Sequence, residues 1–307
     1  MPAPAASPLS VQTVLYGHSP DDLSRFLHGL GAAVRVARRG GALGPVRLAV
    51  GDCSTEPVVP ADRLPALTDQ VASAGIGSLE YRFFGENLGS AGGHNALYGE
   101  LGSELVLIVN PDVYAMPDLL SPMLDRMAEP AVAIVEARQV PLEHPKSFDP
   151  ATGDTSWAST ACALVDGGVM SSLGGFDQES FFLYCDDVDL SWRARLAGRR
   201  VVYEPAACVF HDKRLDPAGQ VVAGEAEVYY SAEAALMMAW KYSRDDLVEE
   251  WGEGLLTTGS SAHARAVETF RSRRAGGRLP EQLDPAGDVA QFVGYAYARH
   301  RFAYDDE

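Results

Sequence analysis

Three carboxylates lie within four positions of the chain, directly after the aromatic and apolar run 181–184: Asp186, Asp187 and Asp189. The apolar residues that follow recur with helical spacing, at Val188, Trp192 and Leu196. The spacing predicts a helix that begins at these carboxylates, where free backbone N–H groups favour acidic side chains. Asp186 as cap with Asp189 three positions later resembles a capping box, although that motif prefers Glu or Gln. Capping then accounts for two carboxylates and leaves Asp187 over, while ordinary helix-start chemistry remains the structural interpretation of the whole segment.

Other polar residues follow predicted strands. Asp52 ends a strand over 46–52, Asp112 follows the very apolar strand 105–109, and His211 ends a strand. In open parallel α/β sheets, ligands bind beyond the carboxyl ends of strands, and a carboxylate there suits Mg²⁺ or Mn²⁺. Each residue also has an ordinary structural interpretation. Asp52 could begin an Asx turn, Asp112 could belong to a turn after Pro111, and a lone His is usually structural.

A glycine-rich segment, ENLGSAGGHN over residues 86–95, leads into a predicted helix. Glycines there would let backbone N–H groups approach a phosphate or a sugar. The segment matches neither the GxGxxG fingerprint nor a P-loop, and glycine-rich turns are common before helices. Its candidate binding residues are Asn87, Gly89, Gly92, Gly93 and Asn95.

Alternating elements must position these residues. Strands are expected at 11–17, 46–52, 79–84 and 105–109, and helices at 20–37, 63–74 and 91–102. This alternation predicts parallel βαβ units in a layered α/β fold. A long loop is expected over 136–154, a strand over 160–165, and two short strands within 198–211. The remainder is expected to be helical, which gives a flexible leader at 1–10, a main domain at 11–215 and a helical region at 216–307.

Composition and net charge argue against several classes of function. The 307 residues carry a net charge of −17 with a pI near 4.8, which argues against binding to nucleic acids or anionic membranes. An anionic small ligand would need a metal ion, local Lys or Arg, or helix N-termini. Four scattered cysteines without a CxxC pair argue against a zinc cage and fit a reducing compartment. Because no secretion signal or membrane-length apolar run is visible, we expect a cytoplasmic protein, peripheral at the inner membrane face if its acceptor is lipid-linked.

In order and spacing, these motifs resemble the family-two glycosyltransferases with the GT-A fold. The resemblance is carried by GDCSTE, ENLGSAGGHN, VNPDV and the block 174–211, and it spans roughly residues 11–211. The block 174–211 is the most specific part. Within the family, the NPDV motif is most similar to the bacterial rhamnosyltransferase-type members. The resemblance implies a Rossmann-like, mostly parallel central sheet flanked by helices, with a helical C-terminal extension.

The resemblance also implies roles. Asp187 would be the catalytic base and Asp186 its supporting neighbour, in place of the usual Glu. A Mn²⁺ or Mg²⁺ ion would be held by Asp112 and His211. The nucleotide side would include Asp52, Asn110 and the glycine-rich segment, and Lys213 and Arg214 could touch the diphosphate. The implied reaction is inverting transfer from a UDP- or dTDP-sugar to a hydroxyl of a saccharide, lipid-linked saccharide or natural product.

Some residues depart from the family pattern. Asn110 replaces the first metal-motif Asp, and Glu233 and Ala234 stand where Arg and Asn are usual. These departures leave open a degenerate, non-catalytic nucleotide-sugar binder. A sugar-1-phosphate nucleotidyltransferase is a weaker alternative, because the expected GxGTR–P–lysine loop is missing after the first strand. The helical region 216–307 is expected to shape the acceptor side or a homodimer contact.

Overall fold

The computed structural model describes residues 7–41, 43–98, 105–213, 215–217, 219 and 222–303. The strands are β1 (Ser7–Leu15), β2 (Leu43–Asp52), β3 (Ser78–Phe83), β4 (Leu105–Val109), β5 (Val113–Ala115), β6 (Val132–Val140), β7 (Cys162–Asp166) and β8 (Arg200–His211). The helices are α1 (Pro20–Arg39), α2 (Leu64–Ser73), α3 (Gly89–Tyr98), α4 (Leu120–Met127), α5 (Gly167–Ser172), α6 (Asp186–Leu196), α7 (Glu225–Lys241), α8 (Asp245–Thr257) and α9 (Ser261–Ala275), with a 3₁₀ turn at Ala61–Arg63.

The strands form one sheet in the order β3-β2-β1-β4-β7-β6-β8-β5. Strands β3, β2, β1 and β4 are parallel, β7 is antiparallel to both of its neighbours, β6 and β8 are parallel, and β5 is antiparallel to β8. Every residue of β4 is buried, as expected for a strand covered on both faces. The predicted α/β architecture with a mostly parallel sheet is confirmed.

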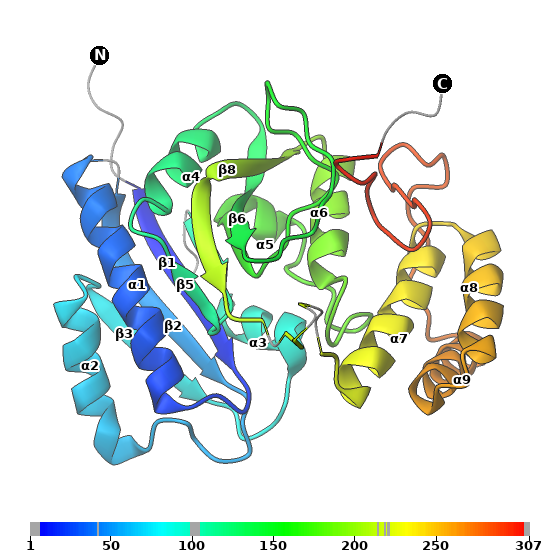
Figure 1. Ribbon diagram of the computed structural model, residues 1–307, viewed down its shortest axis with the longest axis horizontal. Coiled ribbons are helices and arrows are strands. Elements are labelled where there is room, and N and C mark those ends of the chain that lie inside the picture. The colour runs from blue at the N-terminus through cyan, green and yellow to red at the C-terminus, as the bar shows by residue number, and fades with distance from the viewer. Residues whose placement is uncertain are drawn as a thin grey trace.

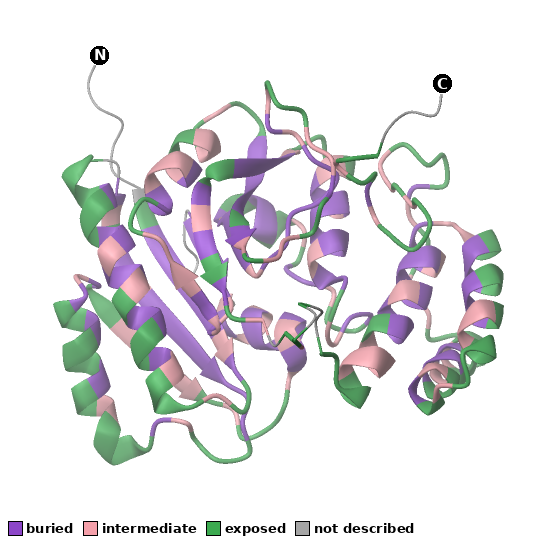
Figure 2. Cartoon of the chain, viewed as in Figure 1, coloured by how far each residue is buried: buried purple, intermediate pink, exposed green. Residues whose placement is uncertain are grey.

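Helices cover both faces of this sheet. One apolar cluster joins the sheet to residues of α1, α2 and α4, and a second cluster joins the other face to α3, α5 and α6. Figure 1 shows these layers, and Figure 2 shows that the central strands are largely buried between them. Within the described residues, no helix is both long and apolar enough to cross a membrane.

The C-terminal helices α7, α8 and α9 stand beside α6 (Figure 1). Their apolar cluster includes Val188 and Trp192 of α6 together with Met237, Trp251 and Phe270. Helix α6 therefore contributes to two cores, one against the sheet and one against the C-terminal helices. This shared core fixes α6 from both sides.

The structure corrects several predicted boundaries. Strand β1 begins at Ser7, inside the segment expected to be a leader, and residues 1–6 lie outside the described part. Strand β6 covers the first residues of the predicted loop 136–154, because the polar Glu136 is buried against a lysine. The two short strands predicted within 198–211 form one strand, β8. A bulge absorbs Pro205, which cannot donate a ladder hydrogen bond: Ala137 pairs with Glu204, but Arg138 pairs with Cys208.

The end of the chain is not helical throughout, contrary to the prediction. After α9 the described residues form irregular structure that returns to the loop 141–157. The amide of Ser147 donates to the Arg299 carbonyl at 2.7 Å, and the amide of Arg301 donates to the Pro145 carbonyl at 2.6 Å. We call residues 296–303 the C-terminal segment. Its contacts attach it to a loop that lies about 150 residues earlier in the chain.

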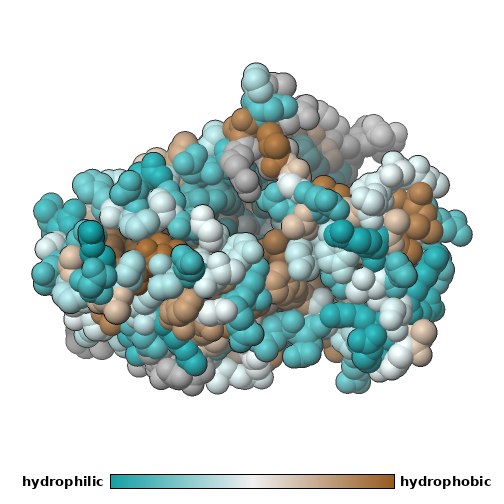
Figure 3. Space-filling model, turned by 90° about the horizontal axis from the view of Figure 1, so that it is seen from below, coloured by the Kyte–Doolittle hydropathy of each residue, from teal (hydrophilic) through white to brown (hydrophobic). Residues whose placement is uncertain are grey.

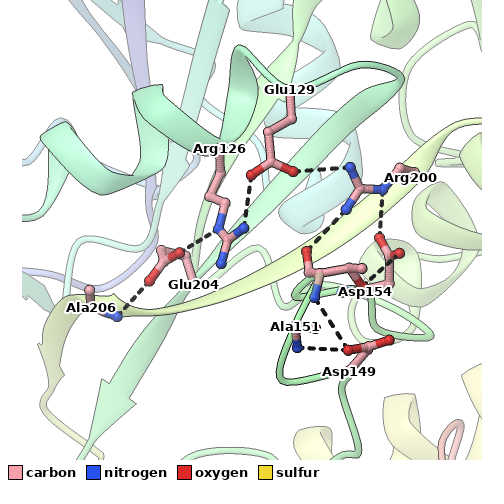
Figure 4. Close-up of polar contacts among 9 residues, drawn as sticks. Arg126, Glu129, Asp149, Ala151, Asp154, Arg200, Glu204 and Ala206 are labelled. Atoms are coloured by element: carbon pink, nitrogen blue, oxygen red, sulfur yellow. Dashed lines mark hydrogen bonds and ion pairs between the residues drawn. The ribbon is translucent and has the colours of Figure 1, made fainter.

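An ion-pair network secures the start of β8 (Figure 4). Arg126, in the last turn of α4, binds Glu204 at 2.6 Å and Glu129 at 2.8 Å. Arg200 binds Glu129 at 3.0 Å and Asp154 at 2.8 Å. Partly exposed pairs contribute little singly, but a network of this kind fixes geometry. It holds the loop 149–154 and one end of β8, and His211 lies at the other end.

Candidate active site

Asp112 and His211 meet at the carboxyl edge of the sheet. Strands β5 and β8 pair antiparallel with Val113 opposite His211, so Asp112, just before β5, lies beside the end of β8. Nε2 of His211 lies 3.4 Å from Oδ2 of Asp112. In Figure 1 the arrowheads of β1, β2 and β8 point downward, and Figure 3 looks onto that edge, a largely hydrophilic face with hydrophobic side chains near its middle. The structure thus brings together the two residues expected to hold the metal.

The surroundings suit a divalent ion. Burial alone would raise the pKa of Asp112, but the hydrogen bond and charge of His211, aided by His18, lower it below its ordinary value. Nδ1 of His211 lies 2.7 Å from Oε1 of the buried Gln139, which orients Nε2 toward Asp112. An ionised carboxylate and an oriented imidazole fit Mn²⁺ or Mg²⁺. The described residues contain no cluster of three His, Cys, Asp or Glu side chains, so further ligands would come from substrate or water.

Asp187 lies in the first turn of α6 and is partly open to solvent. Its Oδ1 accepts a hydrogen bond from the Val188 amide at 2.8 Å, and its Oδ2 accepts a longer one from the Thr160 amide at 3.4 Å. Tyr184 and Cys185 both have positive φ, so the chain turns sharply just before the helix. Burial raises the pKa of Asp187, and the charge of Lys146 offsets part of this rise. A carboxylate with a raised pKa is a better general base near neutral pH.

The carboxylates of Asp186 and Asp189, on either side of Asp187, have different surroundings. Asp186 is 4% exposed, and burial followed by the charge of Asp187 raises its pKa to about 7. Asp189 is fully buried and binds Arg193 at 2.7 Å and Lys241 at 2.6 Å. The capping-box interpretation is therefore wrong, since Cys185 holds the N-cap position and no side chain caps it. The sequence pattern could not reveal the buried cation of α7 that binds Asp189.

Asp52 is fully buried at the end of β2. Its Oδ1 accepts from the Ser54 amide at 3.0 Å, and its Oδ2 accepts from the Val58 amide at 2.7 Å and from the Tyr81 hydroxyl. The Asx turn foreseen as the structural alternative is thus present. These contacts fix the loop that follows β2, and the contact of Asp52 with a nucleotide stays a prediction.

The glycine-rich segment fits tightly against the chain that precedes α6. Gly89 has φ +70°, and a Cβ there would lie 2.2 Å from the carbonyl oxygen of Phe182. That carbonyl accepts a hydrogen bond from the Ser90 amide at 3.1 Å. The side chain of Asn87 accepts from the Gly89 amide at 3.1 Å. Glycine is therefore required at position 89 to join the starts of α3 and α6.

Two further glycines let α3 pack closely. A Cβ on Gly93 would lie 2.8 Å from Cγ1 of Val14 in β1, and one on Gly92 would lie 3.3 Å from Cβ of Leu88. Asn95 donates to the Phe176 carbonyl at 2.8 Å and accepts from the Phe176 amide at 2.9 Å. These contacts are structural, and the expected contacts of these residues with a nucleotide sugar stay predictions.

The remaining predicted residues lie around Asp112. The amide of Asn110 donates to the Ala161 carbonyl at 3.0 Å, and its carbonyl accepts from Val113, so it forms the turn between β4 and β5. Burial lowers the pKa of Lys213, and the charge of Asp112 opposes this shift, which places that ammonium close to Asp112. Arg214 lies outside the described residues.

Sequence reasoning missed His144 and Lys146, which lie in the loop after β6. Desolvation, then the charges of Lys146, Lys213 and His211, lower the pKa of His144 to about 3, although its surface is exposed. Lys146 therefore acts electrostatically on both Asp187 and His144. Both residues belong to a proline-rich loop with no motif that could have revealed them.

Glu233 of α7 lies against α9. It lies 3.9 Å from Arg273 of α9 and is 9% exposed. Its neighbour Ala234 is buried in the C-terminal core. The departure from the family pattern at these positions thus serves the packing of α7 against α9.

The chain is similar to known glycosyltransferases over part of its length. Over 86 residues it is 37% identical to N-acetylglucosaminyl-diphospho-decaprenol L-rhamnosyltransferase of Mycobacterium tuberculosis, covering 27% of this chain and 28% of that protein. Over 145 residues it is 29% identical to the pre-mycofactocin glycosyltransferase of the same species, covering 41% and 30%. The matches thus span less than a third of these curated relatives. No protein-family model matches the chain.

Solved structures establish the fold. GalNAc-T7 with UDP, GalNAc and Mn²⁺ matches with a TM-score of 0.61 at 10% identity, over 91% of this chain and 56% of that chain. The mannosyltransferase PcManGT from Pyrobaculum calidifontis, in complex with GDP-Man and Mn²⁺, matches with a TM-score of 0.53 at 14% identity, over 91% and 77%. The predicted GT-A fold and the resemblance to rhamnosyltransferase-like glycosyltransferases are confirmed.

Proposed function

We propose that this protein is an inverting, metal-dependent glycosyltransferase that moves a sugar from a UDP- or dTDP-sugar to an acceptor hydroxyl. The observation that carries the proposal is the pairing of Asp112 with His211 at 3.4 Å on the carboxyl edge of a GT-A sheet. Sequence similarity to a rhamnosyltransferase and a second glycosyltransferase supports the reaction class. The Mn²⁺ ions named with the two solved structures support a metal requirement.

Each residue would have a defined task. A bound Mn²⁺ or Mg²⁺ ion would neutralise the negative charge of the diphosphate leaving group. Asp112 and His211 would hold that ion, and Lys213 would add positive charge beside it. Such local cations are needed in a chain whose net charge is −17. Asp52, Asn110 and the glycine-rich segment would frame the nucleotide.

Asp187 would act as the general base. It would take the proton of the acceptor hydroxyl while the hydroxyl oxygen forms a bond to C1 of the sugar. The bond between C1 and the diphosphate oxygen would break, and the nucleoside diphosphate would leave with the electron pair. One base opposite the leaving group gives inversion without a covalent intermediate, and the proton then passes from Asp187 to water.

The acceptor side faces α7 in this proposal. The curated rhamnosyltransferase is named for a lipid-linked diphospho-sugar, so we propose a saccharide or lipid-linked saccharide as acceptor. The reaction would then take place in the cytoplasm, at the inner membrane face when the acceptor is lipid-linked. A homodimer through the C-terminal region stays a prediction.

A donor screen tests the proposal. The melting temperature would be measured with UDP, dTDP, GDP and their sugars, each with and without Mn²⁺. A preferred donor at about 100 times its Kd should add about 2.7 kcal/mol to the free energy of unfolding. The gain should require Mn²⁺ and disappear in Asp112→Asn. If no nucleoside diphosphate stabilises the protein, the donor assignment is wrong, and binding without turnover would support the non-catalytic alternative.

A further inference from the structure

We propose that Lys146 is a positioning residue that sets the protonation state of Asp187, through a buried ion pair with Glu136. The inference rests on the proposed role of Asp187 as the base. It concerns a residue from a different part of the chain, in the loop after β6.

The pair is deeply buried. Nζ of Lys146 lies 2.5 Å from Oε2 of Glu136, and both side chains are 4% exposed. The ammonium also lies 3.8 Å from the centre of the Trp157 ring. A buried charge pair contributes little net stability compared with apolar residues, so its presence calls for another explanation.

Glu136 and Asp187 accept hydrogen bonds from adjacent backbone amides. The amide of Ser159 hydrogen-bonds Glu136, and the amide of Thr160 donates to Asp187 at 3.4 Å. The two carboxylates therefore lie on the same short stretch of backbone, within reach of one cation. In agreement with this, the charge of Lys146 lowers the pKa of both carboxyl groups against the rise caused by burial.

This arrangement gives Asp187 an intermediate environment. Without a cation, a buried carboxyl group stays protonated and cannot accept a proton. With a cation of its own at contact distance, it would be ionised but weakly basic. Because Glu136 already neutralises much of the charge of Lys146, that charge offsets only part of the rise that burial causes in the pKa of Asp187. It can therefore ionise and still remain more basic than an exposed aspartate.

The C-terminal segment holds Lys146 in place. Lys146 forms an antiparallel bridge with His300, and the amides of Ser147 and Arg301 pair with this region of the chain. Arg301 also binds Glu143 at 2.7 Å. The loop that carries the cation is thus fixed by residues from the other end of the sequence.

Other titratable groups also act on Asp187. Among the described residues they are Lys146 from the loop, Glu136 from β6, Asp186 and Cys185 from the start of α6, and Tyr297 from the C-terminal segment. Lys146 is the cation among them. Its removal should therefore move the titration of Asp187 in one direction, upward.

The test is the pH dependence of kcat for the wild type and four variants. In Lys146→Met the acidic limb should move up by about 1–3 pH units, because an opposite charge is lost. Lys146→Arg should restore the limb toward the wild type. The double variant Glu136→Gln with Lys146→Met removes both members of the pair, so that no unpaired carboxylate is left buried at position 136. The acidic limb of its pH profile should still lie at higher pH than that of the wild type. Lys241→Met, which removes a buried lysine on the other side of α6, is the matched control and should leave the limb in place.

A second readout does not depend on activity. The carboxyl carbon of Asp187, assigned in ¹³C spectra with Asp187→Asn, should titrate at higher pH in Lys146→Met than in the wild type. An unchanged midpoint, or an equal shift in Lys241→Met, overturns the inference. If no donor is turned over but the midpoint moves as expected, the proposed function fails and the link between Lys146 and Asp187 stands.

Discussion

Two buried lysines flank α6, and they serve its carboxylates in different ways. Lys241 of α7 binds Asp189 at 2.6 Å and Asp177 at 2.7 Å. Asp189 also receives Arg193 and the Tyr242 hydroxyl, at 2.7 and 3.1 Å, so its oxygens are fully engaged. On the other side, Lys146 binds Glu136, and Asp187 keeps two backbone amide donors and some exposure to solvent.

The difference separates structure from chemistry within one helix turn. The oxygens of Asp189 are all occupied by partners within the protein, so none is left to contact a substrate. A carboxylate whose burial is only partly offset by a nearby cation retains affinity for a proton. Asp187 and Asp189 are the same residue type two positions apart, and the capping pattern that set them apart in the sequence is absent from the structure. Their partners from distant segments distinguish them.

The largest expected effect separates the two carboxylates directly. Asp187→Asn should lower kcat by about 10²–10⁴-fold, because a general base is lost, while nucleotide binding is retained. The Asp189→Asn variant should unfold at a lower urea concentration than the wild type but keep much of the turnover per folded molecule. Steady-state kinetics and urea unfolding of both variants check this. Equal losses of turnover in the two would remove the distinction.

Removal of the structural cation should chiefly affect stability. Lys241→Met removes the buried ammonium that Asp189 and Asp177 share, which should cost about 3–5 kcal/mol of unfolding free energy. The pH profile of turnover should be unchanged. Urea unfolding monitored by tryptophan fluorescence provides the measurement. A loss below about 1 kcal/mol would mean that Lys241 is not the structural member of the pair.

The metal-binding end of the site offers a more moderate effect. Gln139→Leu removes the acceptor that orients His211, so the affinity for Mn²⁺ should fall about 10–100-fold. Calorimetric titration with Mn²⁺ in the presence of UDP measures it, with Gln291→Leu, in the exposed C-terminal region, as control. Unchanged affinity would show that His211 is not a ligand.

A change in the pH dependence of stability, rather than in activity, is expected at Asp186. Its pKa is raised from 3.8 to about 7 in the folded protein, so the folded state holds a proton that the unfolded chain has lost. The free energy of unfolding should therefore fall as the pH rises from about 4 to about 7. Asp186→Asn should flatten this dependence. Urea unfolding at several pH values between 4.5 and 7.5 tests it, and parallel curves for the two proteins would assign the slope elsewhere.

Local patterns allowed much of the fold to be predicted. The uninterrupted apolar run of β4, the alternation of strands and helices, and a helix that begins among the carboxylates 186–189 are all confirmed. The approach of His211 to Asp112 also agrees with the expectation. These features depend on periodicity and on the ends of strands, which short stretches of sequence encode.

The features that were missed depend on long-range pairing. Lys146, Lys241 and the C-terminal segment act through contacts with distant residues, and nothing in their local sequence marks them. Strand β8 was predicted as two strands because Pro205 interrupts the pattern, whereas a bulge carries the pairing past it.

The most direct test of the account is whether Asp187 and the metal-binding pair share one cavity. With Mn²⁺ and UDP bound, paramagnetic relaxation should broaden the ¹³C carboxyl resonance of Asp187 strongly and leave that of the distant Asp149 sharp. The broadening should vanish in Asp112→Asn or when Mg²⁺ replaces Mn²⁺. A sharp Asp187 resonance in the presence of bound Mn²⁺ would contradict a single site for the donor, the metal and the base.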